Sequence, residues 1–257
     1  MYERQNRDPF QQRSLFGDSS SLDGAPPIVI ENANARLAFL RRVYGWMFAG
    51  VLATVFGAGI AVKSGIAESM LTWGFLPRIL LVVAWMFSAG AVAKVRKTPT
   101  WNVVAFASYA AFTGFVLSTI IYLAIWLAER NGANGATYLL QAGGLTLGAF
   151  AAISAYAFIS KRDFSFMRGF LTVGSVVLLG ALLIGFFVES TGYQIAISAA
   201  GVLLFSGFVL YDTSRVLKTV PDGEHVAGAM MLYLDFVMLF IYVLRLVLII
   251  AGGGRRS

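Results

Sequence analysis

Long apolar runs alternate with short polar segments along most of this chain. Seven of these runs are close to the ~20 residues that a helix needs to cross a bilayer. Within hydrocarbon every backbone polar group needs an internal partner, and runs of this length meet that condition as helices. The pattern predicts an all-α integral membrane protein with seven transmembrane helices. The predicted spans are residues 43–62, 76–95, 103–127, 138–160, 169–188, 195–217 and 229–251.

The first 35 residues differ from the rest in being polar, with a Pro26-Pro27 pair. They lack the early apolar core of a signal peptide. We predict a disordered cytoplasmic tail over residues 1–35, with a docking role as the alternative, and a seven-helix transmembrane domain over residues 36–257.

The basic residues predict the orientation of the bundle. With the N-terminus in the cytoplasm, fourteen Lys and Arg residues flank the spans on the inner side and five on the outer side. Cytoplasmic loops carry this excess, so a cytoplasmic N-terminus is expected. The short loops suit a bacterial inner membrane.

Small residues recur at helical spacing in two of the predicted spans, and such faces allow two helices to approach closely. We expect both faces to pack against neighbouring helices. They comprise Gly45, Ala49, Ala53 and Gly57 in the first span, and Gly144, Gly148 and Ala152 in the fourth.

The amino-acid composition excludes several kinds of functional site. Of the 257 residues, 58% are hydrophobic and 13% are charged, with a mean hydropathy of +0.74. The chain has no cysteine and one histidine, His225, which excludes disulfides, thiolate chemistry and sites with two imidazoles. The net charge of +7 comes mostly from Lys and Arg beside the spans, so topology explains it better than nucleic acid binding. No catalytic motif occurs, so we expect neither an enzyme nor a cofactor.

Two acidic residues lie within the apolar spans, where charges are costly and usually functional. Asp212 is expected about 7 Å from the cytoplasmic end of the sixth span, and Asp235 about 9 Å from the start of the seventh. The two helices are sequential and antiparallel, so the carboxyls are expected at similar depth. Two such groups in low dielectric do not both ionise readily, so a pair can share one proton and act as a pH-sensitive latch. Once ionised, they can ligate a cation such as calcium. Alternatively, each pairs with a separate cation.

Four further polar residues are candidates of lower rank. Arg96 ends the second span on the side of the aspartates and is their natural counter-charge, or else a topological anchor. Arg245 is expected to extend toward the outer interface. Glu189 ends the fifth span as a pore-mouth or interfacial residue. His225 lies in a polar loop, either sensing pH or simply solvated.

Several of these segments resemble the Bax inhibitor family, also called the transmembrane Bax inhibitor motif proteins, in a bacterial-type form. The similarity covers residues 36–251. The matching pieces are 205–212 with Tyr-Asp-Thr at 211–213, Tyr-Leu-Asp-Phe at 233–236, 239–245, Phe-Thr-Gly-Phe at 112–115, and Ser118.

The resemblance implies a seven-helix fold whose last helix is surrounded by the others, and a pH-sensitive calcium leak. It places the family's paired aspartates at Asp212 and Asp235 and its gating arginine at Arg96. Some members carry an acidic residue inside the second helix. The span around Trp85 has none, which leaves a conduction role for that helix without support.

Three functions remain open from the sequence. The first is the calcium leak gated by the aspartates, with calcium as the permeant ion. The second is a regulatory protein that binds a membrane AAA protease or a stress or cell-death partner. The third is an intramembrane aspartyl protease, which also needs two membrane aspartates. The Gly-x-Gly-Asp and Pro-Ala-Leu elements of those proteases are absent here.

Overall fold

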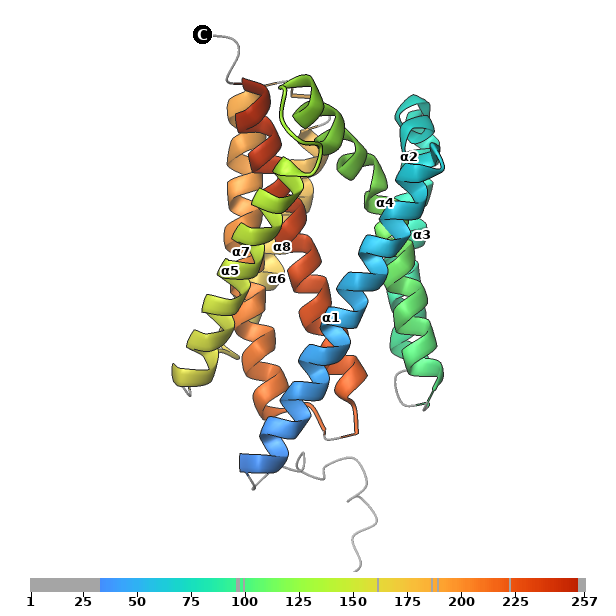
Figure 1. The fold of residues 1–257 in the computed structure, drawn as a ribbon. Coiled ribbons are helices and arrows are strands. Elements are labelled where there is room, and N and C mark those ends of the chain that lie inside the picture. The colour runs from blue at the N-terminus through green and yellow to red at the C-terminus, as the bar shows by residue number, and fades with distance from the viewer. Residues whose placement is uncertain are drawn as a thin grey trace, which may run out of the picture.

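A computed structural model of the chain describes residues 33–95, 98, 100–160, 162–185, 187–188, 190–221 and 223–253, with side chains described from residue 36 onward (Figure 1). No strand occurs in these ranges. The elements are α1 (Ala33–Lys63), α2 (Ile66–Ser69), the 3-10 turn η2 (Met70–Thr72), α3 (Phe75–Val95), α4 (Trp101–Arg130), α5 (Thr137–Ser160), α6 (Met167–Ile184), α7 (Thr191–Lys218) and α8 (His225–Gly253).

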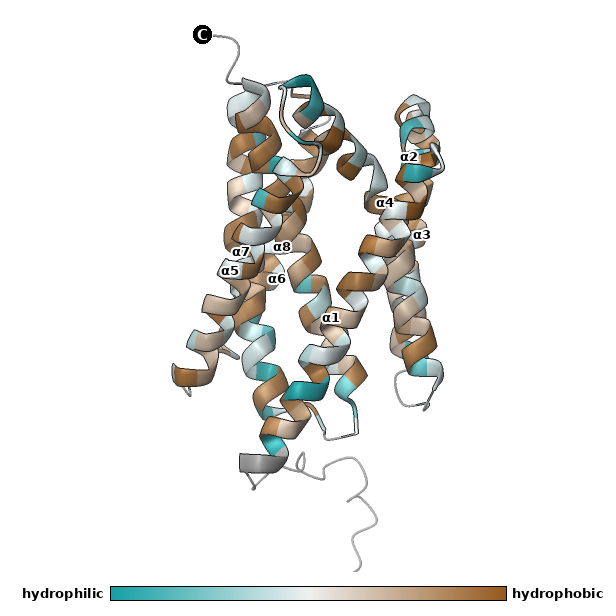
Figure 2. Ribbon diagram, viewed as in Figure 1, coloured by the Kyte–Doolittle hydropathy of each residue, from teal (hydrophilic) through white to brown (hydrophobic). Residues whose placement is uncertain are grey.

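Seven of these helices are long and apolar enough to cross a membrane, as the hydropathy pattern predicts. Most hydrophilic residues lie toward the helix ends, and hydrophobic residues predominate along the middle of the helices (Figure 2). Large side chains such as Phe87, Leu203 and Phe170 are more than two thirds exposed on the outer surface of the bundle. An apolar surface this extensive marks contact with lipid. The chain is therefore an integral membrane protein of seven helices.

The last helix occupies the centre of the bundle. α8 packs mainly against α1, α4, α5 and α7, and a larger share of its length is buried than of any other described helix. In Figure 1 it rises between α1 and α4 on one side and α5 and α7 on the other. The expectation of a last helix surrounded by its neighbours is confirmed.

Several helices extend beyond their predicted spans. α1 begins ten residues before the predicted start, because polar residues can form helix outside the hydrocarbon region where hydropathy gives no signal. It ends at Lys63 because Gly65 takes a left-handed φ of 75°. The connection that follows contains α2 and η2, two short elements that the hydropathy pattern does not predict.

The small-residue face of α1 packs only in its second half. There α1 crosses α4 so closely that a Cβ at Gly57 would lie 2.1 Å from the Ala111 carbonyl oxygen. A Cβ at Gly114 would lie 1.9 Å from the Thr54 carbonyl oxygen. By contrast, Gly45 has no neighbouring atom within 4 Å of such a Cβ.

The predicted packing face of α5 is wrong. Gly144, Gly148 and Ala152 are exposed, and the two glycines have open space where a side chain would project. Small residues at this spacing permit a close helix contact but do not require one. On α5 they lie on the outer surface of the bundle.

Arg36 joins the start of α1 to the end of α7. Its Nη2 donates a hydrogen bond to the Leu217 carbonyl oxygen, one of the last carbonyls of α7. A positive charge at a helix C-terminus also interacts favourably with the helix dipole.

Arg36→Gln is expected to lower the free energy of unfolding by about 1.5 kcal/mol, the value of a hydrogen bond to a charged group. Thermal unfolding in detergent measures this loss. Arg42→Gln is the control, because Arg42 is exposed on the same helix. Equal melting temperatures for the two variants would contradict the expectation.

Candidate functional site

The contact between α7 and α8 sets the geometry of the candidate site. The rings of Phe205 and Tyr242 stack with centroids 5.5 Å apart and planes inclined by 20°. Tyr242 also lies against Gly201, where a Cβ would approach its ring to 2.3 Å. A large ring against a glycine fixes the register of the two helices at this level.

This register places the two aspartates opposite each other. Asp212 follows Phe205 by seven residues, and Asp235 precedes Tyr242 by seven. Seven residues are about two helical turns, so both side chains lie on the faces that carry the stacked rings. In an antiparallel pair the two steps run in the same direction. Consistent with this, the charge of Asp212 acts directly on Asp235.

Both carboxyls lie further from the helix ends than the predicted spans indicate. From the observed ends, Asp212 is about 9 Å from the end of α7 and Asp235 about 15 Å from the start of α8. α8 begins four residues earlier than predicted, because the carbonyl oxygen of Glu224 already accepts the Gly228 N–H. The longer distance for Asp235 reflects this extension of α8 at its polar start, since the two carboxyls lie opposite each other.

The surroundings of the two carboxyls differ. Asp235 is only 5% exposed, and its Oδ2 has no hydrogen-bond partner among the described residues. Asp212 is half-buried and interacts electrostatically with the positive charge of Arg215, three residues further along α7. No hydrogen bond joins the two carboxyls in the described part of the chain. A buried carboxyl with an unpaired oxygen is costly unless it carries a proton or meets a cation.

A layer of neutral hydroxyls lies where α7 meets α1 and α5. Ser154 on α5 and Thr213 on α7 have their hydroxyl oxygens 3.4 Å apart. The Tyr44 hydroxyl of α1 is buried beside both, without a hydrogen bond of good geometry. Thr213 directly follows Asp212 in α7, so the layer and the acidic pair lie at neighbouring levels of that helix.

On the other side of α8, a neutral network ties the helices together. The Tyr233 hydroxyl lies 2.6 Å from the Thr54 hydroxyl oxygen, which itself lies 3.0 Å from the Ala110 carbonyl oxygen. Since Thr54 donates to the carbonyl, Tyr233 donates to Thr54. The Trp85 indole N–H donates to the Thr113 hydroxyl at 2.8 Å and joins α3 to α4. Thus Tyr233 ties one side of α8 to α1 through a neutral hydrogen bond, and Asp235 places the acidic pair on the other side of the same helix.

The remaining predicted residues do not join the pair in the described structure. Arg96 and Glu189 lie outside the described residues. His225 is the first residue of α8, where the sequence predicts a loop, and is partly exposed. Arg245 is partly exposed on α8, three residues beyond Tyr242 and away from the aspartates.

Arg215 is a functional candidate that the sequence reasoning treats only as a topological charge. Its signal is the spacing to Asp212, since residues three apart are neighbours on a helix surface. Thr54 and Tyr233 carry a weaker signal, as hydroxyl-bearing residues within apolar spans.

Two carboxyls alone do not make a resident metal site. In the described residues there is no group of three or more His, Cys, Asp or Glu side chains placed to hold a metal ion. Calcium takes six to eight oxygen ligands. Asp212 and Asp235 therefore suit brief contact with a partly hydrated cation better than permanent coordination.

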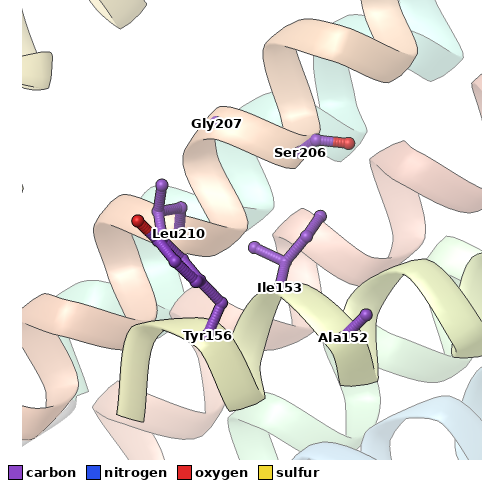
Figure 3. A pocket seen from close by; sticks show the side chains of 6 residues that line it. All are labelled: Ala152, Ile153, Tyr156, Ser206, Gly207 and Leu210. Carbon is purple, nitrogen blue, oxygen red and sulfur yellow. The ribbon is translucent and has the colours of Figure 1, made fainter. Parts of the chain in front are cut away.

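The grooves on the outside of the bundle are lined mainly by apolar residues. Figure 3 shows one between α5 and α7, with a volume of about 380 Å³. Its lining consists of Ala152, Ile153, Tyr156, Ser206, Gly207 and Leu210. Neither aspartate belongs to it, although Leu210 is only two residues from Asp212. This groove belongs to the lipid-facing surface.

Comparison with known proteins reveals clear similarity over the whole bundle. The model of a family described as inhibitor of apoptosis-promoting Bax1 matches residues 36–252. Bax inhibitor 1 of Schizosaccharomyces pombe is 33% identical over 82% of this chain and 76% of its own length. The inner membrane protein YbhL of Escherichia coli K12 is 30% identical over 85% of this chain and 92% of its own. The Golgi anti-apoptotic protein of vaccinia virus is 29% identical over 84% and 86%, respectively.

Proposed function

The chain belongs to the Bax inhibitor family, and from that premise we propose that it is a pH-sensitive calcium leak gated by Asp212 and Asp235. One observation carries the proposal: the α7–α8 register that sets these two membrane-embedded carboxyls opposite each other. The family is not a known class of enzyme, so the protease alternative has no support beyond the presence of two aspartates.

Gating follows from the electrostatics of two close acids. While the pair holds one proton, a single negative charge remains and α7 and α8 stay in contact. Loss of that proton leaves two like charges at low dielectric, which disfavours the contact. The calcium flux is therefore expected to increase as pH rises. Arg215 can hold the ionised Asp212 in the separated state, in addition to the role that the resemblance implies for Arg96.

The permeating ion interacts with the same oxygens. Ionised carboxylates are hard ligands that calcium prefers, and two of them attract it without supplying a full coordination shell. Conduction needs binding that is favourable enough for entry and weak enough for release. The remaining ligands would be water and backbone carbonyls.

Asp212→Asn is expected to abolish the pH dependence of calcium flux, because the amide cannot ionise and the second charge is never created. The measurement is a calcium-dye signal in liposomes with purified protein, from about pH 5 to about pH 8. Arg42→Gln is the control, because it also removes one charge but does so at an exposed position of α1, outside the acidic pair. An Asp212→Asn protein that keeps the wild-type pH profile would refute the gating role.

A regulatory role is the second candidate. It is favoured by the names of two relatives, Bax inhibitor 1 and the Golgi anti-apoptotic protein. In that case the chain would act by binding a membrane protease or a stress-response partner. A reconstituted protein without calcium flux at any pH would favour this role over the leak.

We further propose a bacterial-type inner membrane location, by similarity to YbhL, with the start of α1 on the cytoplasmic side. The described basic residues support this orientation, since Arg36, Arg41, Arg42 and Lys218 share one end of the bundle.

A further inference from the structure

A second groove on the lipid-facing surface differs from the α5–α7 groove in carrying a charge. It lies between α1 and α5 and has a volume of about 580 Å³. Its only charged lining residue is Arg41, and nearly all the rest of its surface is apolar. The lining is Leu37, Leu40, Arg41, Tyr44, Phe48, Leu147, Phe150, Ala151, Ser154, Ala155 and Phe158.

From this groove we infer a binding site for an anionic phospholipid, with an acyl chain between α1 and α5 and the phosphate on Arg41. The groove opens to the bilayer, because Leu37 is 56% exposed and Leu147 46% exposed. Its floor is made by the ring of Tyr44, which contacts Phe150 and Phe158 at centroid distances of 6.3 and 6.1 Å.

The length of the groove matches the thickness of one leaflet of a bilayer. From Leu147 to Phe158 it follows about 16 Å of α5, at ~1.5 Å per residue. This is about half of the ~30 Å hydrocarbon thickness of a bilayer. An acyl chain that entered from the end where α1 begins would be accommodated along its length.

Arg41 lies at the depth at which lipid headgroups are found. It precedes the first apolar run of α1 by two residues and therefore lies at the level of the interface. Its guanidinium has no hydrogen bond or ion pair to any other described residue. Guanidinium binds phosphate oxygens through two parallel hydrogen bonds, and basic residues at this level attract anionic lipids.

Two other grooves lack this combination. The one between α6 and α7, lined by residues such as Phe170 and Leu203, contains no charged residue among those described. The one beside α2 contains Arg78, but this arginine already donates a hydrogen bond to the Leu71 carbonyl oxygen. Of these three grooves in the described part of the chain, the α1–α5 groove alone joins a long apolar trough to an arginine whose guanidinium makes no hydrogen bond to a described residue.

Photocrosslinking in nanodiscs of phosphatidylcholine tests the site. The probe is phosphatidylglycerol with a diazirine in its acyl chain, and the reference is phosphatidylcholine with the same chain. We expect about tenfold more labelling of segments 37–48 and 147–158 by the anionic probe, because the phosphate of phosphatidylcholine is already neutralised by its own choline; tenfold corresponds to about 1.4 kcal/mol. The α6–α7 groove should be labelled equally by both probes.

Variants separate this site from general lipid contact. Arg41→Gln should remove the preference for the anionic probe, whereas Arg42→Gln, exposed but outside the groove, should keep it. Ala151→Trp should reduce labelling by filling the groove. Equal labelling by the two probes, or equal effects of Arg41→Gln and Arg42→Gln, would overturn the inference. So would competition by soluble glycerol phosphate, which would indicate a site for a free phosphate ester.

Discussion

Gly114→Ala is expected to lower the free energy of unfolding by about 3 kcal/mol, at the upper end of the cost of overpacking. The added Cβ would lie 1.9 Å from the Thr54 carbonyl oxygen and 2.8 Å from the Ala58 nitrogen. Both atoms belong to the backbone of α1, so no side chain can rotate away. The two helices would have to separate, and the contact between α1 and α4 is the most extensive in the bundle.

Thermal unfolding in detergent, followed by tryptophan fluorescence, measures this loss. Gly59→Ala is the matched control, because Gly59 is also helical but a Cβ added there would have no neighbouring atom within 4 Å. It should be neutral or slightly stabilising, since alanine favours helix over glycine by roughly 1 kcal/mol. Similar melting temperatures for the two variants would show that α1 and α4 do not approach this closely.

The glycines of the crossing are also expected to act as a unit. Gly57 meets Ala111 at the same crossing at which Gly114 meets Thr54. Once one methyl group has separated the helices, the second finds space already open. The double variant Gly57→Ala, Gly114→Ala should therefore cost less than the two single variants together.

Asp235→Asn is expected to stabilise the protein by about 2 kcal/mol at neutral pH while it abolishes pH-dependent flux. The carboxyl is 5% exposed, one of its oxygens is unpaired, and a second acid faces it from α7. An amide of the same shape removes the charge from this position. A residue retained at a cost in stability is typical of function, so the two measurements should change in opposite directions.

Asp163→Asn provides the contrast. Asp163 lies in the loop before α6, where its Oδ1 accepts the Ser165 N–H at 2.9 Å, and this bond lowers the pKa of the carboxyl. Here the charge is solvated and hydrogen-bonded, so removing it should slightly destabilise the protein and leave flux unchanged. Destabilisation by Asp235→Asn as well would mean that Asp235 is structural.

Hydropathy predicted the membrane helices well because the bilayer imposes both length and composition on them. The ends of the helices were less predictable. Residues 33–42 continue α1 outside the apolar run, and α2 depends on the local turn at Gly65. Small-residue spacing was ambiguous for a physical reason. Gly57 packs against a helix and Gly148 faces lipid, and both environments are apolar.

The acidic pair was accessible from sequence because a carboxyl within an apolar run is rare and the connection between the last two helices is short. The register that joins the pair was not, since it depends on the fit of Tyr242 against Gly201. The neutral hydrogen-bond network of Thr54 and Tyr233 could not be predicted from the sequence either. Thr54 gains its role from Tyr233, which is 179 positions away in the chain.

The central place of α8 has a consequence for how the protein is assembled. α1, α3 and α4 pack together, as do α5, α6 and α7, and α8 contributes most of the contact between the two groups. A ribosome makes α8 after all six of these helices. Until α8 has been inserted, the two groups of three helices are joined mainly where α4 meets α5. Their unfilled inner faces, including Asp212, are the surfaces that an insertion chaperone would have to shield during synthesis.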